Sequence, residues 1–227
     1  MKGSCDSSGI AMELRWWSTN SRAWEGWAID FMLGGEVSGR QLGIVGMGRI
    51  GRAVAAKAGC FAMRVAYTPS PHSTADPMLA PDGTPYTPMS FDQLLVTSDV
   101  VSLHVPLRPE TRHLIDAKAL ARMKRSAFLV NMARGPVVDE AALAWALREG
   151  LISGAALDVY ENEPAIHPDL LGLEQVVLAP HLGSATRETR TAMADLAVRN
   201  VITVIDGQPP LTPVPGSFLP GAGGKGQ

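Results

Sequence analysis

The chain contains 227 residues, of which 46 % are hydrophobic and 19 % are charged, and its formal net charge at pH 7 is −2. This composition predicts a folded chain with a substantial core. The sequence has no basic stripe, so nucleic-acid binding is not indicated. The chain contains no run of about 18 or more apolar residues, so no membrane span is predicted. Its first residues lack the apolar segment of a secretory signal. Cys5 and Cys60 are too few for a disulfide framework or a cysteine metal site. We therefore expect a soluble cytoplasmic protein with no metal site.

The first 35 residues divide into a small, polar start (1–11), expected to be disordered, and an aromatic segment (12–33). This segment carries four tryptophans, Trp16, Trp17, Trp24 and Trp27. So much aromatic surface is unfavourable in water, so the segment is expected to pack against other protein surface. That surface is either the flank of the chain's own domain or a subunit interface.

From residue 36 onwards, predicted strands alternate with predicted helices. Apolar runs predict strands at 42–45, 63–67, 99–107, 126–132, 152–159 and 175–180. Helical patterns cover 50–60, 90–99, 116–123 and 139–150, with Ser90 as an N-cap and Gly150 as a C-cap glycine. Residues 69–90, rich in Pro, Ser and Thr, are interpreted as a loop. The alternation predicts an α/β fold: a Rossmann-type, doubly wound parallel sheet with helices on both faces.

A long helix is predicted over residues 184–207, where Gly207 ends it. Its apolar residues fall on one stripe: Met193, Leu196, Ala197, Val201, Val204 and Ile205. The tail from residue 213, which contains several Pro and Gly, is expected to be disordered.

Three glycines, Gly46, Gly48 and Gly51, form a GxGxxG pattern between the first predicted strand and the first predicted helix. In that context the pattern is typical of dinucleotide binding. The first glycine permits a tight turn, the second lets a pyrophosphate approach the backbone, and the third allows close packing of helix on strand. The alternative is a glycine-rich turn without a ligand.

The dinucleotide fingerprint expects an acidic residue after the second strand, where it would bind the ribose 2′-hydroxyl. This chain has Thr68 and Ser70 there instead, and the first acidic residue downstream is Asp76. Without a carboxylate, a 2′-phosphate is not repelled, and both hydroxyls could donate to it. No arginine follows, and His72 is a poor substitute. The sequence favours NADP(H) over NAD(H).

Three chemically distinctive residues follow predicted strand ends: Arg134, Glu163 and His181. Each has a structural alternative: a surface arginine, a loop acid and a helix cap. Together they suit the reduction of a 2-oxo acid. A protonated histidine can donate to a carbonyl oxygen that receives a hydride, and a carboxylate behind the imidazole would fix its tautomer. An arginine can bind the substrate carboxylate with two hydrogen bonds.

The stretches GIVGMGRIG, VNMARGPVVDEAAL, AALDVYENEP and APHLGSAT occur in this order. Together they resemble the D-isomer-specific 2-hydroxyacid dehydrogenases, closest to the glyoxylate/hydroxypyruvate reductases. The resemblance runs from about Trp24 to Pro213. It implies that Arg134 binds substrate, Glu163 orients the histidine and His181 is the general acid/base. It implies cofactor contacts for Arg49, Ile50, Val105, Pro106, Met132, Ala133, Arg134, Asp158, His181, Gly183 and Ser184. His104 and His113 match no catalytic position, and His167 is interpreted as a loop residue.

The resemblance also implies a domain organisation. Residues 1–35 are expected to form a disordered start and a truncated interdomain helix or linker, and residues 36–184 a dinucleotide-binding domain. Residues 185–212 would be the C-terminal helix of an otherwise missing substrate domain, and 213–227 a disordered tail. We therefore predict measurable NADP(H) affinity, strongly reduced reductase activity and a homodimer formed through the nucleotide-binding domain. The competing hypotheses are a truncated or non-catalytic NAD(P)-binding module, similar to corepressors, and a dehydrogenase of another 2-hydroxy acid.

Overall fold

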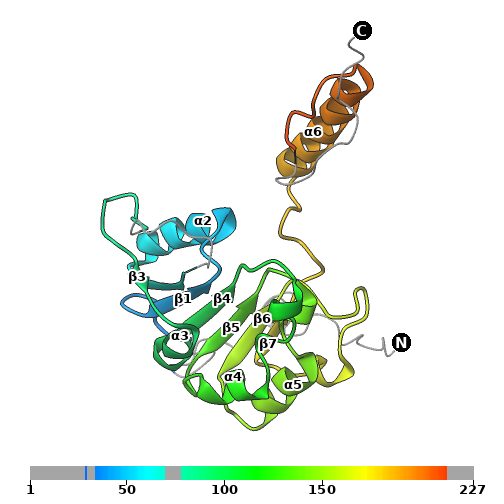
Figure 1. Cartoon of the computed structure of the whole chain (residues 1–227). Helices are drawn as coiled ribbons and strands as arrows, with labels where there is room; N and C mark the ends of the chain where they lie inside the picture. Colours follow the sequence, from blue (N-terminus) through cyan, green and yellow to red (C-terminus); the bar gives the residue numbers. More distant parts are fainter. Residues whose placement is uncertain (1–28, 30–33, 70–77, 214–227) are drawn as a thin grey trace. The chain divides into compact units, whose positions relative to one another are not determined.

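The computed structural model describes residue 29 and residues 34–69 and 78–213, which form two units that divide between His181 and Leu182. The first unit contains a seven-stranded sheet in which all neighbouring strands are parallel (Figure 1). Its order is β3-β2-β1-β4-β5-β6-β7. The strands are β1 Gln41–Val45, β2 Arg64–Thr68, β3 Thr87–Pro88, β4 Val100–Leu103, β5 Phe128–Asn131, β6 Gly154–Leu157 and β7 Val176–Leu178. The predicted doubly wound sheet is confirmed. The four N-terminal tryptophans and the tail beyond residue 213 lie outside the described residues.

Helices cover both faces of this sheet. They are α2 Arg49–Ala58, α3 Phe91–Thr97, α4 Ala117–Arg122 and α5 Glu140–Arg148. Successive residues of a strand face opposite sides, so β1 shows which helix lies where. Leu42 and Ile44 share a buried cluster with Ala55 of α2. Gly43, between them, faces α3, where an added Cβ would lie 2.6 Å from Leu94 Cδ2. The helices α3, α4 and α5 share the larger core cluster.

The predicted helix ends have the expected chemistry. The Ser90 hydroxyl accepts a hydrogen bond from Gln93 N, and the Gln93 side chain accepts one from Ser90 N. This pairing is a capping box, which satisfies two backbone donors that the helix leaves free. Gly150 follows α5 with φ +62°, a conformation that favours glycine.

The loop prediction for residues 69–90 was wrong at one place. Thr87 and Pro88 form the short strand β3, which pairs with Ala66 and Tyr67 of β2 at the edge of the sheet. A two-residue strand has no apolar run to reveal it. Its proline is tolerated because an edge strand can lack a donor.

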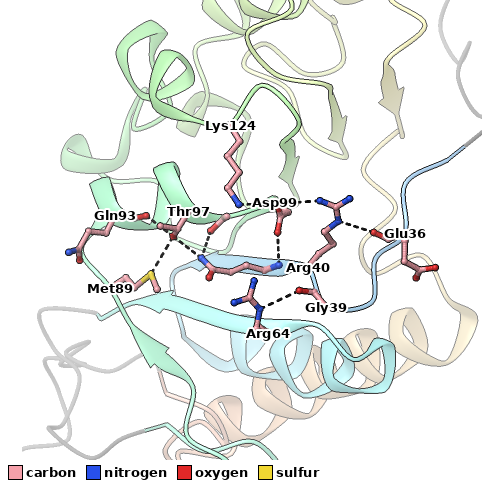
Figure 2. A network of polar contacts seen from close by, with 11 residues as sticks. Glu36, Gly39, Arg40, Arg64, Met89, Gln93, Thr97, Asp99 and Lys124 are labelled. Carbon is pink, nitrogen blue, oxygen red and sulfur yellow. Dashed lines mark hydrogen bonds and ion pairs between the residues drawn. The ribbon is translucent and has the colours of Figure 1, made fainter.

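Asp99, just before β4, connects to the start of β1 and to the segment after α4, at the edge where the strands begin (Figure 2). Its carboxylate accepts hydrogen bonds from Gln41 N at 2.8 Å and Lys124 Nζ at 2.9 Å, and Arg40 Nη1 lies 3.8 Å away. The side chain is 13 % exposed. The Gln41 hydrogen bond is the largest of several effects that lower the pKa of Asp99 below its ordinary 3.8.

We expect Asp99→Asn to lower the free energy of unfolding by about 2 kcal/mol at pH 7, because hydrogen bonds to a charged acceptor are lost. A depressed folded-state pKa stabilises above the unfolded value, and this contribution disappears as pH falls through the folded value. The difference between variant and wild type should therefore shrink below about pH 4. Urea unfolding of variant and wild type at pH 7 and below about pH 4 measures this difference. Asp92→Asn, whose carboxylate pairs with Arg122 on the surface, is the matched control and should cost under about 0.5 kcal/mol.

The second unit contains α6, Arg187–Ile205. The Thr186 hydroxyl caps it by accepting from Thr189 N at 3.1 Å, and Gly207 ends it with φ +73°. Among the described residues none of α6 is buried, so the predicted apolar stripe is exposed. No helix of the described chain is both long enough and apolar enough to traverse a lipid bilayer.

Candidate active site

The glycine turn after β1 depends on residues without side chains. Gly46 has φ +99°, and an added Cβ would lie 2.8 Å from the His104 carbonyl group. At Gly51 an added Cβ would lie 2.3 Å from Gly46 O, so α2 approaches the turn only because this residue has no side chain. An added Cβ at Gly48 would meet open space. Gly48 caps α2 without a side-chain hydrogen bond, and no acidic residue occupies the first turn. These features fit an anion at the helix N-terminus.

A cavity of about 430 Å³ lies beside this turn. It brings together five of the residues predicted to contact a cofactor: Gly46, Gly48, Thr68, Val105 and Pro106. The Thr68 hydroxyl accepts a hydrogen bond from Gly46 N at 3.3 Å, and its own hydrogen is still available to donate. Ser70 and His72 lie outside the described residues.

Two further predicted contacts, Arg49 and Ile50, line a separate hollow of about 550 Å³ along α2. His104 forms part of the wall of both spaces. Its Nε2 lies 2.9 Å from the Ser102 hydroxyl oxygen, and burial lowers its pKa below 6.5. The imidazole is therefore neutral at pH 7, so His104 lines both spaces without adding a charge to either.

The turn that carries Arg134 is held by Asn131, the buried last residue of β5. The Asn131 side chain accepts from Ala133 N at 3.0 Å and donates to Arg134 O at 3.1 Å. Met132 and Arg134 are exposed, whereas Ala133 is buried. The exposed guanidinium donates to Ala133 O at 2.6 Å. A guanidinium has five N–H donors, so this exposed side chain can also receive a carboxylate from solvent.

Glu163 and His181 are in direct contact at the ends of β6 and β7. His181 Nδ1 lies 2.9 Å from Glu163 Oε2, and Glu163 Oε1 accepts from Tyr160 N at 3.1 Å. Tyr160 also donates its hydroxyl to Ala179 O at 2.9 Å, which ties the end of β6 to the segment that carries His181. His181 itself has φ +53°, a left-handed conformation uncommon for residues other than glycine. A cavity of about 360 Å³ borders both side chains.

The electrostatics of this pair define the histidine tautomer. The hydrogen bond with His181 is the largest effect that lowers the pKa of Glu163 below 4.5, and the charge of Arg134 contributes in the same direction. At neutral pH Glu163 is therefore an anion and only accepts hydrogen bonds. His181 Nδ1 must then carry a hydrogen, and Nε2 is the ring nitrogen that remains for a substrate.

The loop with Arg134 and the loop with Glu163 are packed backbone to backbone. An added Cβ on Gly135 would lie 1.8 Å from Tyr160 C and O. Glu161 N donates to Glu140 Oε1 at 2.7 Å, and Glu140 N donates to Glu161 Oε1 at 3.3 Å. These contacts fix the two loops relative to one another.

The remaining predicted residues are divided between the two units. Asp158 is buried after β6, and its backbone N donates to Asn131 O at 3.0 Å. Gly183 and Ser184 belong to the second unit. His113 Nε2 lies 2.8 Å from Glu161 Oε1, outside the contact between Glu163 and His181. Within the described ranges, no group of three His, Cys, Asp or Glu side chains is arranged to hold a metal ion.

The structure adds two residues that sequence reasoning missed. Arg108 lines the 430 Å³ cavity together with Thr68. Its signal in the sequence is a charged residue shortly after Val105 and Pro106, two of the predicted cofactor contacts. Tyr160 holds both Glu163 and the chain before His181. A tyrosine between a strand and the loop that carries Glu163 gives no sequence signal of that role.

Comparison with known proteins shows the family. The family model "D-isomer specific 2-hydroxyacid dehydrogenase, NAD binding domain" matches residues 10–183. A glyoxylate reductase from Korarchaeum cryptofilum is 52 % identical over 186 residues, which are 81 % of this chain and 54 % of that protein. This chain thus spans about half the length of the curated relatives that it matches.

Two solved structures extend the comparison. A glyoxylate reductase from Paecilomyes thermophila is 40 % identical with a TM-score of 0.75, covering 91 % of this chain and 63 % of that one. An NADPH-dependent glyoxylate/hydroxypyruvate reductase from Sinorhizobium meliloti, in complex with NADP and malonate, is 33 % identical with a TM-score of 0.78, covering 92 % and 63 %. The chain belongs to the D-isomer specific 2-hydroxyacid dehydrogenases, whose NAD-binding domain it contains.

Proposed function

We propose that this chain serves the NAD(P)H-dependent reduction of a small 2-oxo acid, glyoxylate or hydroxypyruvate, to the 2-hydroxy acid. The single observation that carries the proposal is the 2.9 Å contact between His181 Nδ1 and Glu163 Oε2. A nucleotide-binding module without catalysis has no need of an oriented imidazole. Relatives named glyoxylate reductase support the choice of substrate class.

Each residue of the trio has a defined task in the proposed reaction. The dinucleotide held at the glycine turn would supply the hydride for the carbonyl carbon. His181 donates a proton from Nε2 to the carbonyl oxygen as that oxygen gains negative charge. Glu163 accepts from Nδ1, keeps Nε2 toward the substrate and stabilises the protonated ring. Arg134 binds the substrate carboxylate, and its charge also polarises the neighbouring carbonyl group.

The proposed cofactor is NADP(H) in preference to NAD(H). The position at the end of β2 that would hold an acidic residue in an NAD enzyme is Thr68. A similar solved structure is described as NADPH-dependent and contains NADP. The predicted homodimer and the cytoplasmic location stay predictions, and sedimentation velocity tests the first.

A two-part assay tests the function. We expect NADPH to bind, as measured by its fluorescence, and to be consumed when glyoxylate or hydroxypyruvate is added. Acetaldehyde, which has a carbonyl group but no carboxylate for Arg134, should support no oxidation. Arg134→Gln should raise KM for glyoxylate by at least about tenfold, because a charged hydrogen-bonding partner contributes roughly 1.5–3 kcal/mol.

The possible negative results differ in meaning. Binding of NADPH without oxidation by any 2-oxo acid would leave a non-catalytic dinucleotide-binding module, the competing hypothesis. Equal rates with acetaldehyde and glyoxylate would remove Arg134 from substrate binding.

A further inference from the structure

A cofactor with a 2′-phosphate needs a cation, and the end of β2 supplies none. Thr68, the last residue of β2, and Pro69 after it line the cavity, but neither carries a charge. A hydroxyl donates one hydrogen bond and leaves the phosphate charge uncompensated. Arginine is suited to this task, because its planar guanidinium can donate two parallel hydrogen bonds to a phosphate.

The sheet topology brings an arginine to this place from another strand. The central strand β1 pairs with β2 on one side and β4 on the other, so that Thr68, Val45 and Leu103 lie level across the three strands. The segments after β2 and β4 therefore leave the same edge of the sheet, on either side of the glycine turn. Arg108, from the segment after β4, lines the same cavity as Thr68.

The backbone around Arg108 is fixed by Thr111. The Thr111 hydroxyl donates to Pro106 O at 2.7 Å and accepts from Arg108 N at 2.8 Å. Thr111 N also donates to Arg108 O at 3.0 Å. The residue at position 108 is therefore presented from a closed turn, and its side chain is 53 % exposed.

We infer that Arg108 binds the 2′-phosphate of NADP(H), so that the segment after β4 determines cofactor specificity. This inference rests on the nucleotide site of the proposed function and names the residue that selects between the two cofactors. The present neighbour of the guanidinium is Glu110, with Oε1 3.7 Å from Arg108 Nη1 and the side chain 65 % exposed. This exposed ion pair without a hydrogen bond is weak and can yield to a phosphate.

Glu110 also defines the opposing reading. Its carboxylate lines the same cavity and could accept a hydrogen bond from a ribose 2′-hydroxyl, which would favour NAD(H). Two single substitutions separate these assignments. If Arg108 binds the 2′-phosphate, Arg108→Gln weakens NADPH binding. If Glu110 binds the 2′-hydroxyl, Glu110→Gln weakens NADH binding.

The experiment is a fluorescence titration of the whole chain with NADPH and NADH, supplemented by competition with 2′,5′-ADP and 5′-ADP. Arg108→Gln should raise Kd for NADPH and for 2′,5′-ADP by at least about tenfold, while Kd for NADH and 5′-ADP stays within about twofold. Arg112→Gln is the matched control: it removes an equal charge from the next turn of chain, outside the cavity lining. It should change every Kd by less than about twofold. Glu110→Gln should leave NADH binding unchanged and leave NADPH binding equal or tighter.

Three results would overturn the inference. If Arg108→Gln and Arg112→Gln raise Kd equally, the effect is only long-range electrostatics. If Arg108→Gln raises Kd equally for NADPH and NADH, Arg108 lies away from the 2′-phosphate. Weaker NADH binding in Glu110→Gln would support the opposing reading. If wild type binds neither dinucleotide, the nucleotide site of the proposed function itself fails, which is a different outcome from binding that ignores Arg108.

Discussion

His181→Ala lowers kcat for glyoxylate reduction by about 10²–10⁴-fold, the range for loss of a general acid. The reason is geometric: Nδ1 is committed to Glu163 at 2.9 Å, so Nε2 is the donor for a carbonyl oxygen. Alanine provides no proton, and water cannot be held at that position with the same orientation. Binding of NADPH should change by less than about threefold, because the glycine turn and its cavity hold the dinucleotide. Single-turnover decay of NADPH absorbance measures the rate.

The control for this prediction is His167→Ala. His167 accepts a hydrogen bond from Asp169 N, whereas the partners of Glu163 are His181 and Tyr160. Its removal should leave kcat within about twofold. Glu163→Gln should fall between the two, since the ring keeps a neighbour but loses the anion that orients it. An unchanged kcat in His181→Ala would remove this histidine from the chemistry and leave dinucleotide binding alone.

The fold could be predicted from sequence because its information is local. Apolar runs such as Leu42–Val45 alternate with helical patterns, and buried parallel strands leave this signature. Ser90 and Gly150 marked helix ends for reasons contained within a few residues. The strand β3 was missed because its two residues depend on pairing with β2, a contact that no local pattern encodes.

The candidate site was predictable only in part, for a related reason. Arg134, Glu163 and His181 follow predicted strands, and parallel strands end along a common edge, so their proximity could be inferred. Arg108 also follows a predicted strand, but its closeness to Thr68 could not be inferred. Its relation to Thr68 depends on β4 and β2 both pairing with β1, and the sequence does not state the strand order. In the chain itself, Thr68 and Arg108 are separated by β3, α3 and β4.

Gly135→Ala is expected to lower the free energy of unfolding by about 3 kcal/mol or more, at the upper end of overpacking costs. The added methyl group would lie 1.8 Å from Tyr160 C and O and 2.4 Å from Glu161 N. These are backbone atoms, so no side chain can rotate away, and one of the two loops must move. Tyr160 N donates to Glu163 Oε1, so a displaced loop also carries Glu163 away from His181. Thermal and urea unfolding measure the loss of stability.

The matched control is Gly59→Ala, at the end of α2. An added Cβ there meets nothing within 4 Å, and φ −58° suits alanine, so stability should be unchanged or raised by up to about 1 kcal/mol. A second readout separates the loops from general folding: in folded Gly135→Ala the glycine turn after β1 is unaltered, so NADPH should still bind, yet glyoxylate should be reduced more slowly than by wild type. If Gly135→Ala unfolds at the wild-type temperature and retains wild-type kcat, the two loops are not packed as closely as the contact between Gly135 and Tyr160 requires, and the fixed placement of Arg134 beside Glu163 loses its physical basis.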